Sequence, residues 1–461
     1  MKNIRLLFKY EAIGLVRSRL FQVAIGLLML VGLYAIYYGK SEIDQQRAVL
    51  KEIRADEEKK MESLRSKIST DTLPNVIGNR TFRLVENPPS DWASLSIGQR
   101  DIFPYQLYVR YYSLSRQIMT AEIANPEKLL TGNFDLAFVL IYIFPLFIIA
   151  LSYNLISGER EGGTLSLLLS NPISESQITY IKIAFRWLLS FGIALFLIVL
   201  AVIICSININ STLLWWLLAT ALYFAFWMGI VLIINNLKRN SSFNAFSLLG
   251  AWIVIVIVVP TLINLYLASA YAAPPRNDLT QAIRHEFEEI WAKYDDKDHR
   301  YQTAQKLAAK YPAYKSDTSY NWEDKYMLAE TDFYDERLAP LFAKYQNLNL
   351  QKESVGQKLS VLSAAALTQQ VFNALAQTDT QNHYSFLDEV GRFHAEMKVF
   401  FYTKIFQNKT FKLTDFEQIP KYEFKKKPIS NEANNGILLL LVSVIVVWGI
   451  GLMMRRFMAD F

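Results

Sequence analysis

The chain has 461 residues, of which 52% are hydrophobic and only 20% are charged, whereas roughly a quarter of the residues of an average soluble domain are charged. The formal net charge of +6 is modest, and no basic cluster of the kind that binds nucleic acid stands out. The single cysteine, Cys205, lies in an apolar run, which excludes a disulfide framework and a cysteine metal site. This composition favours a membrane protein.

Six stretches are long and apolar enough to cross a bilayer as helices, which takes about 20 residues each. Buried helices of a large soluble protein would usually keep a polar face, and these stretches carry almost no charge. A cleaved signal is disfavoured for the first one, because its apolar core is longer than about 7–15 residues and no small-residue cleavage site follows it. We therefore predict six transmembrane helices, at residues 20–38, 134–156, 188–207, 213–234, 246–267 and 437–454.

Lysine and arginine residues near the span ends predict the orientation. Every basic cluster falls on one side if both termini are cytoplasmic, and the turn between the third and fourth spans, SININST, is uncharged. The basic residues are Lys2, Arg5, Lys9, Arg17 and Arg19; Arg160, Lys182 and Arg186; Lys238 and Arg239; and Arg455 and Arg456. This topology leaves residues 39–133 and 268–436 outside the cytoplasm.

The segments outside the spans have distinct patterns. Residues 1–19 predict a basic amphipathic helix lying in the cytoplasmic membrane interface, although a charged flank that only fixes the orientation is an alternative. The two large insertions show mostly helical spacing, and we expect them to form one extracytoplasmic domain, with strands possible only near the turn-rich residues 86–104. The predicted fold is thus an all-α polytopic membrane protein with six transmembrane helices, an N-terminal interfacial helix and a cytoplasmic tail at 455–461.

Two groups of residues invite a chemical interpretation that the sequence does not support. The tripeptide GKS at 39–41 ends like a phosphate loop, but Tyr34 stands where that motif needs a glycine. The histidines share no metal-binding spacing of i,i+4, and hydrogen-bonded or exposed histidines are the simpler interpretation of His285, His299, His383 and His394. No metal site, catalytic site or cofactor is predicted in this chain.

The predicted spans contain few prolines or polar residues that indicate a function. Pro145 and Pro260 predict kinks in the second and fifth spans, because proline lacks a backbone donor. There is no row of acidic residues or histidines within the membrane of the kind that a proton-driven transporter uses. Asn235 and Asn236 stand at a span end and need no functional interpretation.

The link between the second and third spans, GEREGGTLSLLLSNPISESQITYIK at 158–182, is unusually elaborate. Gly158 is expected to stop the second span, and Thr164 to cap a short helix of leucines that Asn171-Pro172 ends. Ser174 and Gln177 form a predicted capping box for the next helix. Apolar residues exposed on a charged platform predict a docking surface on the cytoplasmic side; an ordinary loop would explain neither the leucines nor the double cap.

This link resembles the cytoplasmic signature of type-2 permeases of the ATP-binding-cassette (ABC) superfamily, which have six spans and a Glu-Arg-Glu-x-Gly-Thr-Leu segment before a short coupling helix. The insertions resemble the branch that includes the permease for nitrous-oxide-reductase maturation, through PSDWASLSIGQRDIFP and ALAQTDTQNHYSFLDEVGRF, although Gln377 replaces an expected glycine. In this superfamily a separate cytoplasmic ATPase supplies the energy. The resemblance implies that this ATPase docks on the coupling-helix region at 157–187, through Gly158, Glu159, Arg160, Glu161, Gly163, Thr164, Leu165, Leu168, Leu169 and Pro172.

What the resemblance implies is an ABC exporter permease of the bacterial inner membrane. ATP and Mg²⁺ would bind to a separate cytoplasmic ATPase dimer, and a second permease subunit, identical or a sister, would complete the pathway. The extracytoplasmic domain would bind a partner protein or cargo, through aromatic-rich segments at 103–112 and 320–345; alternatively those aromatics only hold the domain together. Two other classes stay open: a membrane-anchored scaffold or sensor without translocation, and a membrane-embedded enzyme.

Overall fold

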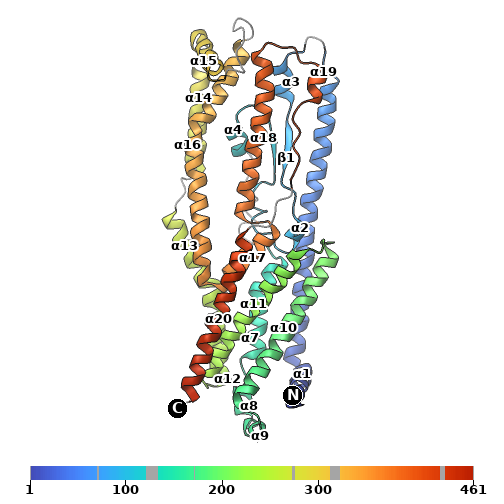
Figure 1. Cartoon of the computed structure of the whole chain (residues 1–461), viewed down its shortest axis with the longest axis vertical. Helices are drawn as coiled ribbons and strands as arrows, with labels where there is room; N and C mark the ends of the chain where they lie inside the picture. Colours follow the sequence, from blue (N-terminus) through green and yellow to red (C-terminus); the bar gives the residue numbers. More distant parts are fainter. Residues whose placement is uncertain are drawn as a thin grey trace.

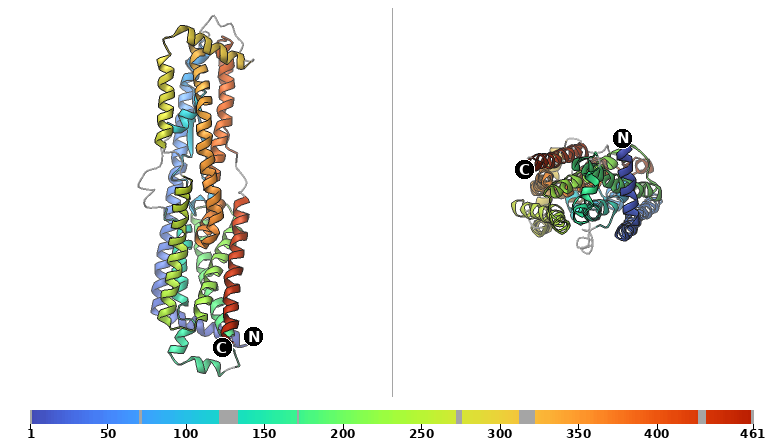
Figure 2. Two further views of the ribbon diagram at one scale, coloured as in Figure 1. Left: turned by 90° about the vertical axis from the view of Figure 1, so that its left-hand side faces the viewer. Right: turned by 90° about the horizontal axis from the view of Figure 1, so that it is seen from below.

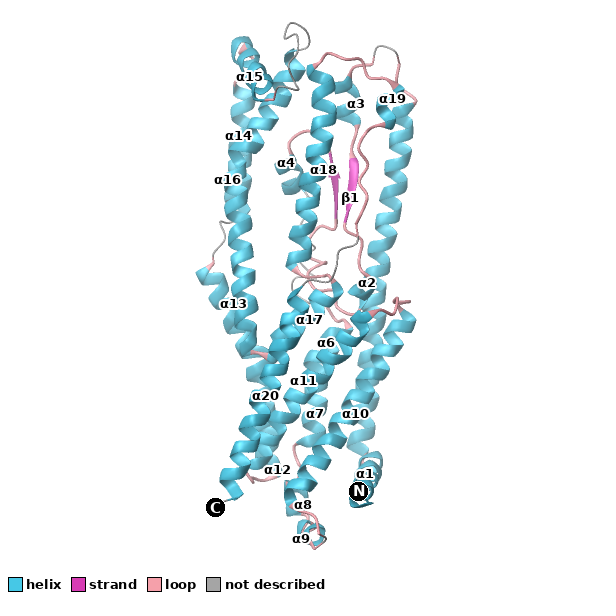
Figure 3. Ribbon diagram, in the orientation of Figure 1, coloured by secondary structure: helices cyan, strands magenta, loops and turns pink. Residues whose placement is uncertain are grey.

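The computed structural model describes residues 2–69, 72–120, 133–170, 172–271, 276–311, 322–425 and 431–459. The molecule is long and narrow, and both termini lie at the same end, which we call the terminal end (Figure 1). The helices next to the terminal end form an apolar bundle, and further helices extend from it into a distal body (Figures 1 and 2). Most of the described chain is helical (Figure 3).

The structure has six helices or joined helical runs that are long and apolar enough to cross a membrane. Each contains or largely overlaps one predicted span, so the prediction of a six-span, all-α polytopic protein is confirmed. The six are Arg19–Arg65 (helix α2), Leu136–Glu161 (α6 Leu136–Phe138, η2 Val139–Ile143, α7 Phe144–Ser152 and α8 Ser157–Glu161), Glu175–Ile204 (α10), Ser211–Asn236 (α11), Ser241–Ala270 (α12 Ser241–Trp252, η3 Ile253–Val258 and α13 Val259–Ala270) and Glu432–Phe457 (within α20, Asn431–Ala459).

The N-terminal helix α1, Lys2–Arg17, lies across the long axis of the molecule at the terminal end (Figure 2). Ser18 separates it from α2, and its side chain accepts a hydrogen bond from the backbone of Phe21. Helix α2 then continues without a break for 47 residues, from the bundle into the distal body (Figure 1). The first span and the charged helix that follows it in the sequence are therefore one element.

The two prolines inside the spans coincide with changes of helical winding. Pro145 is the second residue of α7 and Pro260 the second residue of α13, and each follows a π-helical turn, η2 or η3. A proline cannot donate the regular backbone hydrogen bond, and π turns are a recognised cause of bends in helices. The irregularity predicted at these positions is thus present as local π-helix.

Helix α11 is at the centre of the bundle and packs closely on α20. Trp216 and Trp227 on α11 are completely buried. At Gly229, a side chain would come within 2.7 Å of Val447 on α20, and the Asn236 amide donates a hydrogen bond of 2.8 Å to the Gly451 carbonyl. Small residues that let helix backbones approach are typical of packing within membranes. Asn236 serves the packing of α11 on α20, whereas the Asn235 amide donates to the Ser152 carbonyl of α7.

The distal body is joined to the bundle by a short helix, α17 (Ala364–Ala376), which inserts between bundle helices (Figure 1). Phe372 on α17 stacks on Trp216, and the Ser363 hydroxyl donates to the Ile255 carbonyl. Val371 fills the space beside Gly436 on α20, where a side chain would come within 2.5 Å. The second large insertion therefore contributes to the core of the bundle as well as to the distal body.

The rest of the distal body consists of a main core and a helical arm. The core contains an antiparallel pair of strands in which Leu84 lies opposite Tyr108. The arm packs through Ile290, Tyr334 and Leu338. The core elements are α3 Pro74–Arg80, β1 Arg83–Glu86, β2 Gln106–Val109, α4 Leu114–Thr120, α18 Thr380–Phe406 and α19 Leu413–Glu417. Those of the arm are α14 Arg276–Ala292, α15 Lys297–Lys310, α16 Trp322–Leu359 and η5 Ser360–Leu362. The short helix η1, Asp91–Ser94, packs on the core of the bundle through Trp92.

Much of the aromatic side-chain surface expected to contact a partner is internal. Tyr111 packs against Phe401, with ring centroids 5.1 Å apart, and Tyr326 and Tyr334 are buried. The prediction that these segments form an external contact surface is wrong for these three tyrosines. Tyr111 packs in the core that the two insertions share, and Tyr326 and Tyr334 pack inside the arm. The alternative, that the aromatics hold the distal body together, fits them.

Candidate functional site

The link between the second and third spans is the most extreme point of the terminal end (Figure 1). Helix α8 is followed by a tight turn at Gly163, whose φ of +71° suits glycine. The short helix α9, Leu165–Leu169, comes next, and Pro172, which is exposed, leads to α10. Asn171 lies outside the described residues. The predicted capping box is confirmed, because Ser174 and Gln177 each accept the other's backbone N–H.

Two predictions about local structure in this link are wrong. Gly158 does not stop the second span, since it lies inside α8, where the Gly162 amide donates to its carbonyl. Thr164 does not cap α9 with its side chain. Its backbone is already helical, with φ −87° and ψ −13°, and its hydroxyl donates to the carboxylate of Glu159 instead. A charged acceptor makes the stronger hydrogen bond.

The leucines of α9 divide into two pairs. Leu165 and Leu168 are partly buried and pack against the core of the bundle. Leu167 is 71% exposed and Leu169 is 40% exposed. An exposed apolar pair thus exists, as expected, but Leu165 and Leu168 anchor the helix, while Leu167, which the sequence pattern did not single out, contributes most of the exposed apolar surface.

Glu159 belongs to a network of charges that joins three helices. Its carboxylate lies 2.7 Å from the Lys182 ammonium on α10, and the same ammonium lies 2.9 Å from Glu11 on α1. Arg186, one turn further along α10, is 3.7 Å from Glu11. The Lys182 side chain is only 6% exposed, and a buried cation needs such partners. The network therefore fixes α8 and α1 against the start of α10.

Arg160 and Glu161 make contacts on the other side of the link, with the turn before the fifth span. The Arg160 guanidinium donates a 2.7 Å hydrogen bond to the Lys238 carbonyl. Glu161 accepts a 2.6 Å hydrogen bond from the backbone N–H of Ser241, the first residue of α12. A carboxylate at a helix N-terminus also interacts favourably with the helix dipole. Both residues therefore connect the second span to the fifth.

The three charged residues of the Glu-Arg-Glu signature thus act within the chain, and they position α9 with its exposed leucines. Sequence reasoning missed Glu11 and Ser241, and it used Lys182 and Arg186 only as markers of orientation. The i,i+4 spacing of Lys182 and Arg186 puts both cations on one face of α10, which was a signal that an acidic partner stands opposite. Nothing in the sequence indicated that the partner was Glu11.

The remaining candidate residues have structural partners. His299 lies 3.2 Å from Glu330, and His394 lies 3.1 Å from the Tyr112 carbonyl. Over the part of the chain that the structure describes, no group of three His, Cys, Asp or Glu residues could hold a metal ion. Gly39 of the GKS tripeptide faces the Ser94 carbonyl so closely that a Cβ atom would overlap it. This glycine lets α2 pack against η1.

Comparison with protein families gives two matches. Residues 107–260 match the ABC-2 family transporter protein model, which supports an ABC-2 type permease of the multi-pass membrane class. Permeases of this family generally work with a cytoplasmic ATPase partner. Residues 277–425 match a domain of unknown function, DUF3526. A comparison with curated proteins found no match.

Proposed function

We propose that this chain is the transmembrane subunit of an ABC exporter, or of a related machine that uses ATP for mechanical work across the membrane. A separate cytoplasmic ATPase dimer hydrolyses ATP, and α9 is the coupling helix on which it docks. The observation that carries the proposal is the exposed leucine pair on α9, Leu167 and Leu169, on a helix that is held in place by Glu159. The family match of the membrane region supports the same function.

The proposal has a defined orientation and assembly. The terminal end, with both termini and α9, faces the cytoplasm of a bacterial inner membrane, and the distal body is extracytoplasmic. The basic residues Lys182, Arg186, Arg239 and Arg455 near the terminal end support this orientation. Two permease subunits, identical or sisters, form the pathway. The distal body, which contains the DUF3526 match, binds cargo or a partner protein.

In this mechanism, closure of the ATPase dimer moves α9, and the charge network transmits the movement. Glu159 carries it to α10 and α1, while Arg160 and Glu161 carry it to the start of the fifth span. Coupling free energies between two sites are typically about 1–3 kcal/mol, so the loss of one good contact is enough to uncouple ATP hydrolysis from transport. No residue of this chain takes part in the chemistry.

The test is affinity purification of the tagged chain from its native host, with mass spectrometry of co-purifying proteins and an ATP hydrolysis assay. We expect an ATPase with a phosphate-loop sequence, and we expect the double variant Leu167→Asp/Leu169→Asp to lose it. The control is Ile209→Asp, which changes a 75% exposed residue at the other end of the bundle.

Equal recovery of the ATPase with both variants would refute the assignment of α9. An ATPase that binds the chain, but whose rate of ATP hydrolysis no substrate increases, would favour the scaffold or sensor instead. Turnover of a lipid or a peptide by the purified chain alone would favour the membrane-embedded enzyme.

A further inference from the structure

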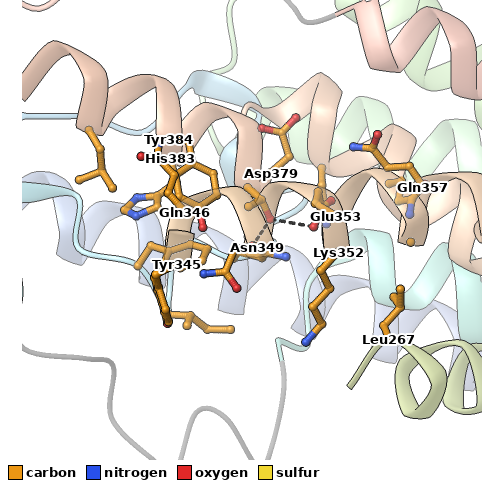
Figure 4. Close-up of a pocket in the computed structure, with 18 of the residues that line it drawn as sticks. Leu267, Tyr345, Gln346, Asn349, Lys352, Glu353, Gln357, Asp379, His383 and Tyr384 are labelled. Carbon is orange, nitrogen blue, oxygen red and sulfur yellow. Dashed lines mark hydrogen bonds between the residues drawn. The ribbon is translucent and has the colours of Figure 1, made fainter. Parts of the chain in front are cut away.

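A large cavity lies where the arm, the distal body and the bundle meet. Its volume is about 1040 Å³, and it is partly open. Helix α16 of the arm, the start of α18 and the end of α13 supply its walls, with Leu267 of α13 on the bundle side (Figure 4). Pockets for small organic ligands have volumes of about 300–1,000 Å³, so this cavity has room for one.

Among the described residues, five carboxylates line this cavity, and we consider the three that come from three different elements: Glu353 on α16, Asp379 at the start of α18 and Glu432 at the start of α20. The other two are Asp335 and Asp388. Burial, together with the charges of Glu432 and Glu353, raises the pKa of Asp379 to about 6. Burial is also the main cause that raises the pKa of Glu353. The charge of Glu432 also contributes to raising both pKa values, which is the repulsion expected between carboxylates that line one cavity.

The partners of these carboxylates on the protein side are neutral. Glu353 accepts a 3.2 Å hydrogen bond from the Thr380 hydroxyl, and Asp379 accepts one of 2.8 Å from the backbone of Asn382. Lys352 also lines the cavity, but its side chain extends away from the Glu353 carboxylate (Figure 4). Its charge lowers the pKa of Glu353 by less than burial raises it. The local charge of this part of the cavity is negative.

Aromatic rings form another part of the cavity wall. Tyr345 and Tyr384 line it beside His383, which stacks on Phe103 with ring centroids 4.1 Å apart (Figure 4). Burial lowers the pKa of His383 to about 4, so this imidazole is neutral at neutral pH and does not offset the carboxylates. Aromatic faces next to carboxylates attract organic cations by cation–π and ionic interactions.

We propose that this cavity is a binding site for an organic cation with an apolar body. The carboxylates Glu353, Asp379 and Glu432 bind the positive charge, and the aromatic wall packs against the apolar part. An anion would meet repulsion from the same three groups. A bare metal ion is a poorer fit, because the described residues offer no metal-binding group of three side chains. The site goes beyond the transport role proposed above and does not depend on it.

A cation bound in this cavity would affect how the arm, the distal body and the bundle pack together. Its carboxylates come from the arm, from the distal body and from α20, which packs on α11 in the centre of the bundle. A bound cation removes the repulsion between them and so favours the arrangement in which the three elements meet. The ligand therefore stabilises the junction between the distal body and the membrane helices.

The experiment uses the full-length chain in lipid nanodiscs and two ions of the same shape and opposite charge, tetraphenylphosphonium and tetraphenylborate. Equilibrium dialysis measures binding, and empty nanodiscs give the lipid background. We expect saturable binding of one phosphonium per chain and no saturable binding of the borate. Equal binding of the two ions, or no saturable binding of the phosphonium, overturns the proposal.

A charge-removing variant locates the site. Glu353→Gln/Asp379→Asn/Glu432→Gln keeps the side-chain shapes, and asparagine still caps α18. We expect the affinity for phosphonium to fall by about tenfold or more, as for other buried ionic contacts. The control is Glu396→Gln, an exposed carboxylate on α18. An unchanged affinity in a folded triple variant refutes this location. If the triple variant does not fold, the proposal is tested by whether the wild-type chain binds the phosphonium and not the borate.

Discussion

The indole ring of Trp216 stacks on the phenyl ring of Phe372, with ring centroids 4.1 Å apart and ring planes within 8° of parallel. Trp216 belongs to the fourth span, and Phe372 comes from the second insertion. Trp92 of the first insertion also stacks on Trp216, at 6.1 Å. One tryptophan of the bundle therefore contacts both insertions, and it links the stability of the distal body to that of the membrane helices.

Phe372→Ala tests this link. The phenylalanine is fully buried, and removing such a ring from a packed core costs about 3–5 kcal/mol. We expect a loss of this size in the free energy of unfolding, measured in mixed micelles. The control is Phe196→Ala, whose ring is 52% exposed on the bundle surface, and which should cost clearly less. Equal losses for the two variants would show that the stack does not hold the insertions.

Gly39→Ala should disrupt the packing of α2 on η1. The new methyl group would overlap the Ser94 carbonyl, and forcing an extra group into a packed interior costs about 1–3 kcal/mol. The matched control is Gly26→Ala on the same helix, where nothing lies within 4 Å. This control should stabilise the chain by about 0.5–1 kcal/mol through better helix propensity. Thermal unfolding in detergent compares the two, and a stabilising Gly39→Ala would contradict the contact.

The charge network predicts non-additive effects of mutation. In a double-mutant cycle with Glu11→Gln and Lys182→Met, we expect an interaction energy of about 1–3 kcal/mol, because the Lys182–Glu11 pair is largely buried. The control cycle uses Asp56→Asn and Lys60→Met, an exposed pair on α2 that should give less than about 1 kcal/mol. Strictly additive effects of Glu11→Gln and Lys182→Met would mean that α1 does not bind α10 through this contact.

Asp379 predicts a pH dependence of stability. Its pKa is about 6 in the folded chain against an ordinary value of 3.8, so the folded state keeps a proton that the unfolded state loses. The contribution of Asp379 to the free energy of unfolding therefore falls as the pH rises from about 4 to about 6. Asp379→Asn removes this loss, and we expect it to gain about 2–3 kcal/mol relative to the wild type across that window.

The comparison has to be made as a difference between these two proteins. His383 has a folded pKa of about 4, below its ordinary 6.5, and therefore makes the chain more stable as the pH rises over nearly the same range. Because His383 is present in both proteins, its contribution cancels in the difference. A stability difference that does not change between about pH 4 and about pH 6 would show that Asp379 is not protonated in this window.

The sequence was sufficient for what depends on neighbouring residues. Apolar length predicted the six membrane helices, and the Ser174–Gln177 capping box was recognisable because both partners lie within one turn. The expectation that Gln377 stands at a glycine position also has a local cause, since its φ is +57° at the end of α17. Such features follow from backbone geometry alone.

The sequence was insufficient where the partners are distant in the chain. Glu11 and Lys182 are paired only because α1 crosses the terminal end beneath α10. Thr164 has a capping residue type in a capping position, but Glu159 provides a better acceptor for its hydroxyl. The division of the α9 leucines likewise depends on what packs against them. The cavity with Glu353, Asp379 and Glu432 draws on three elements, and no spacing in the sequence brings them together.

Helix α2 has one more consequence. Its 47 residues contain no proline, and at 1.5 Å per residue they form a rod about 70 Å long. Its lower end is joined to α1 at Ser18, and its upper end contributes Met61 and Leu64 to the core of the distal body. A rod of this length acts as a lever: a tilt of about 5° at one end displaces the other by about 6 Å. A small movement of α1 at the terminal end is thus amplified in the distal body, with no loop in between to absorb it.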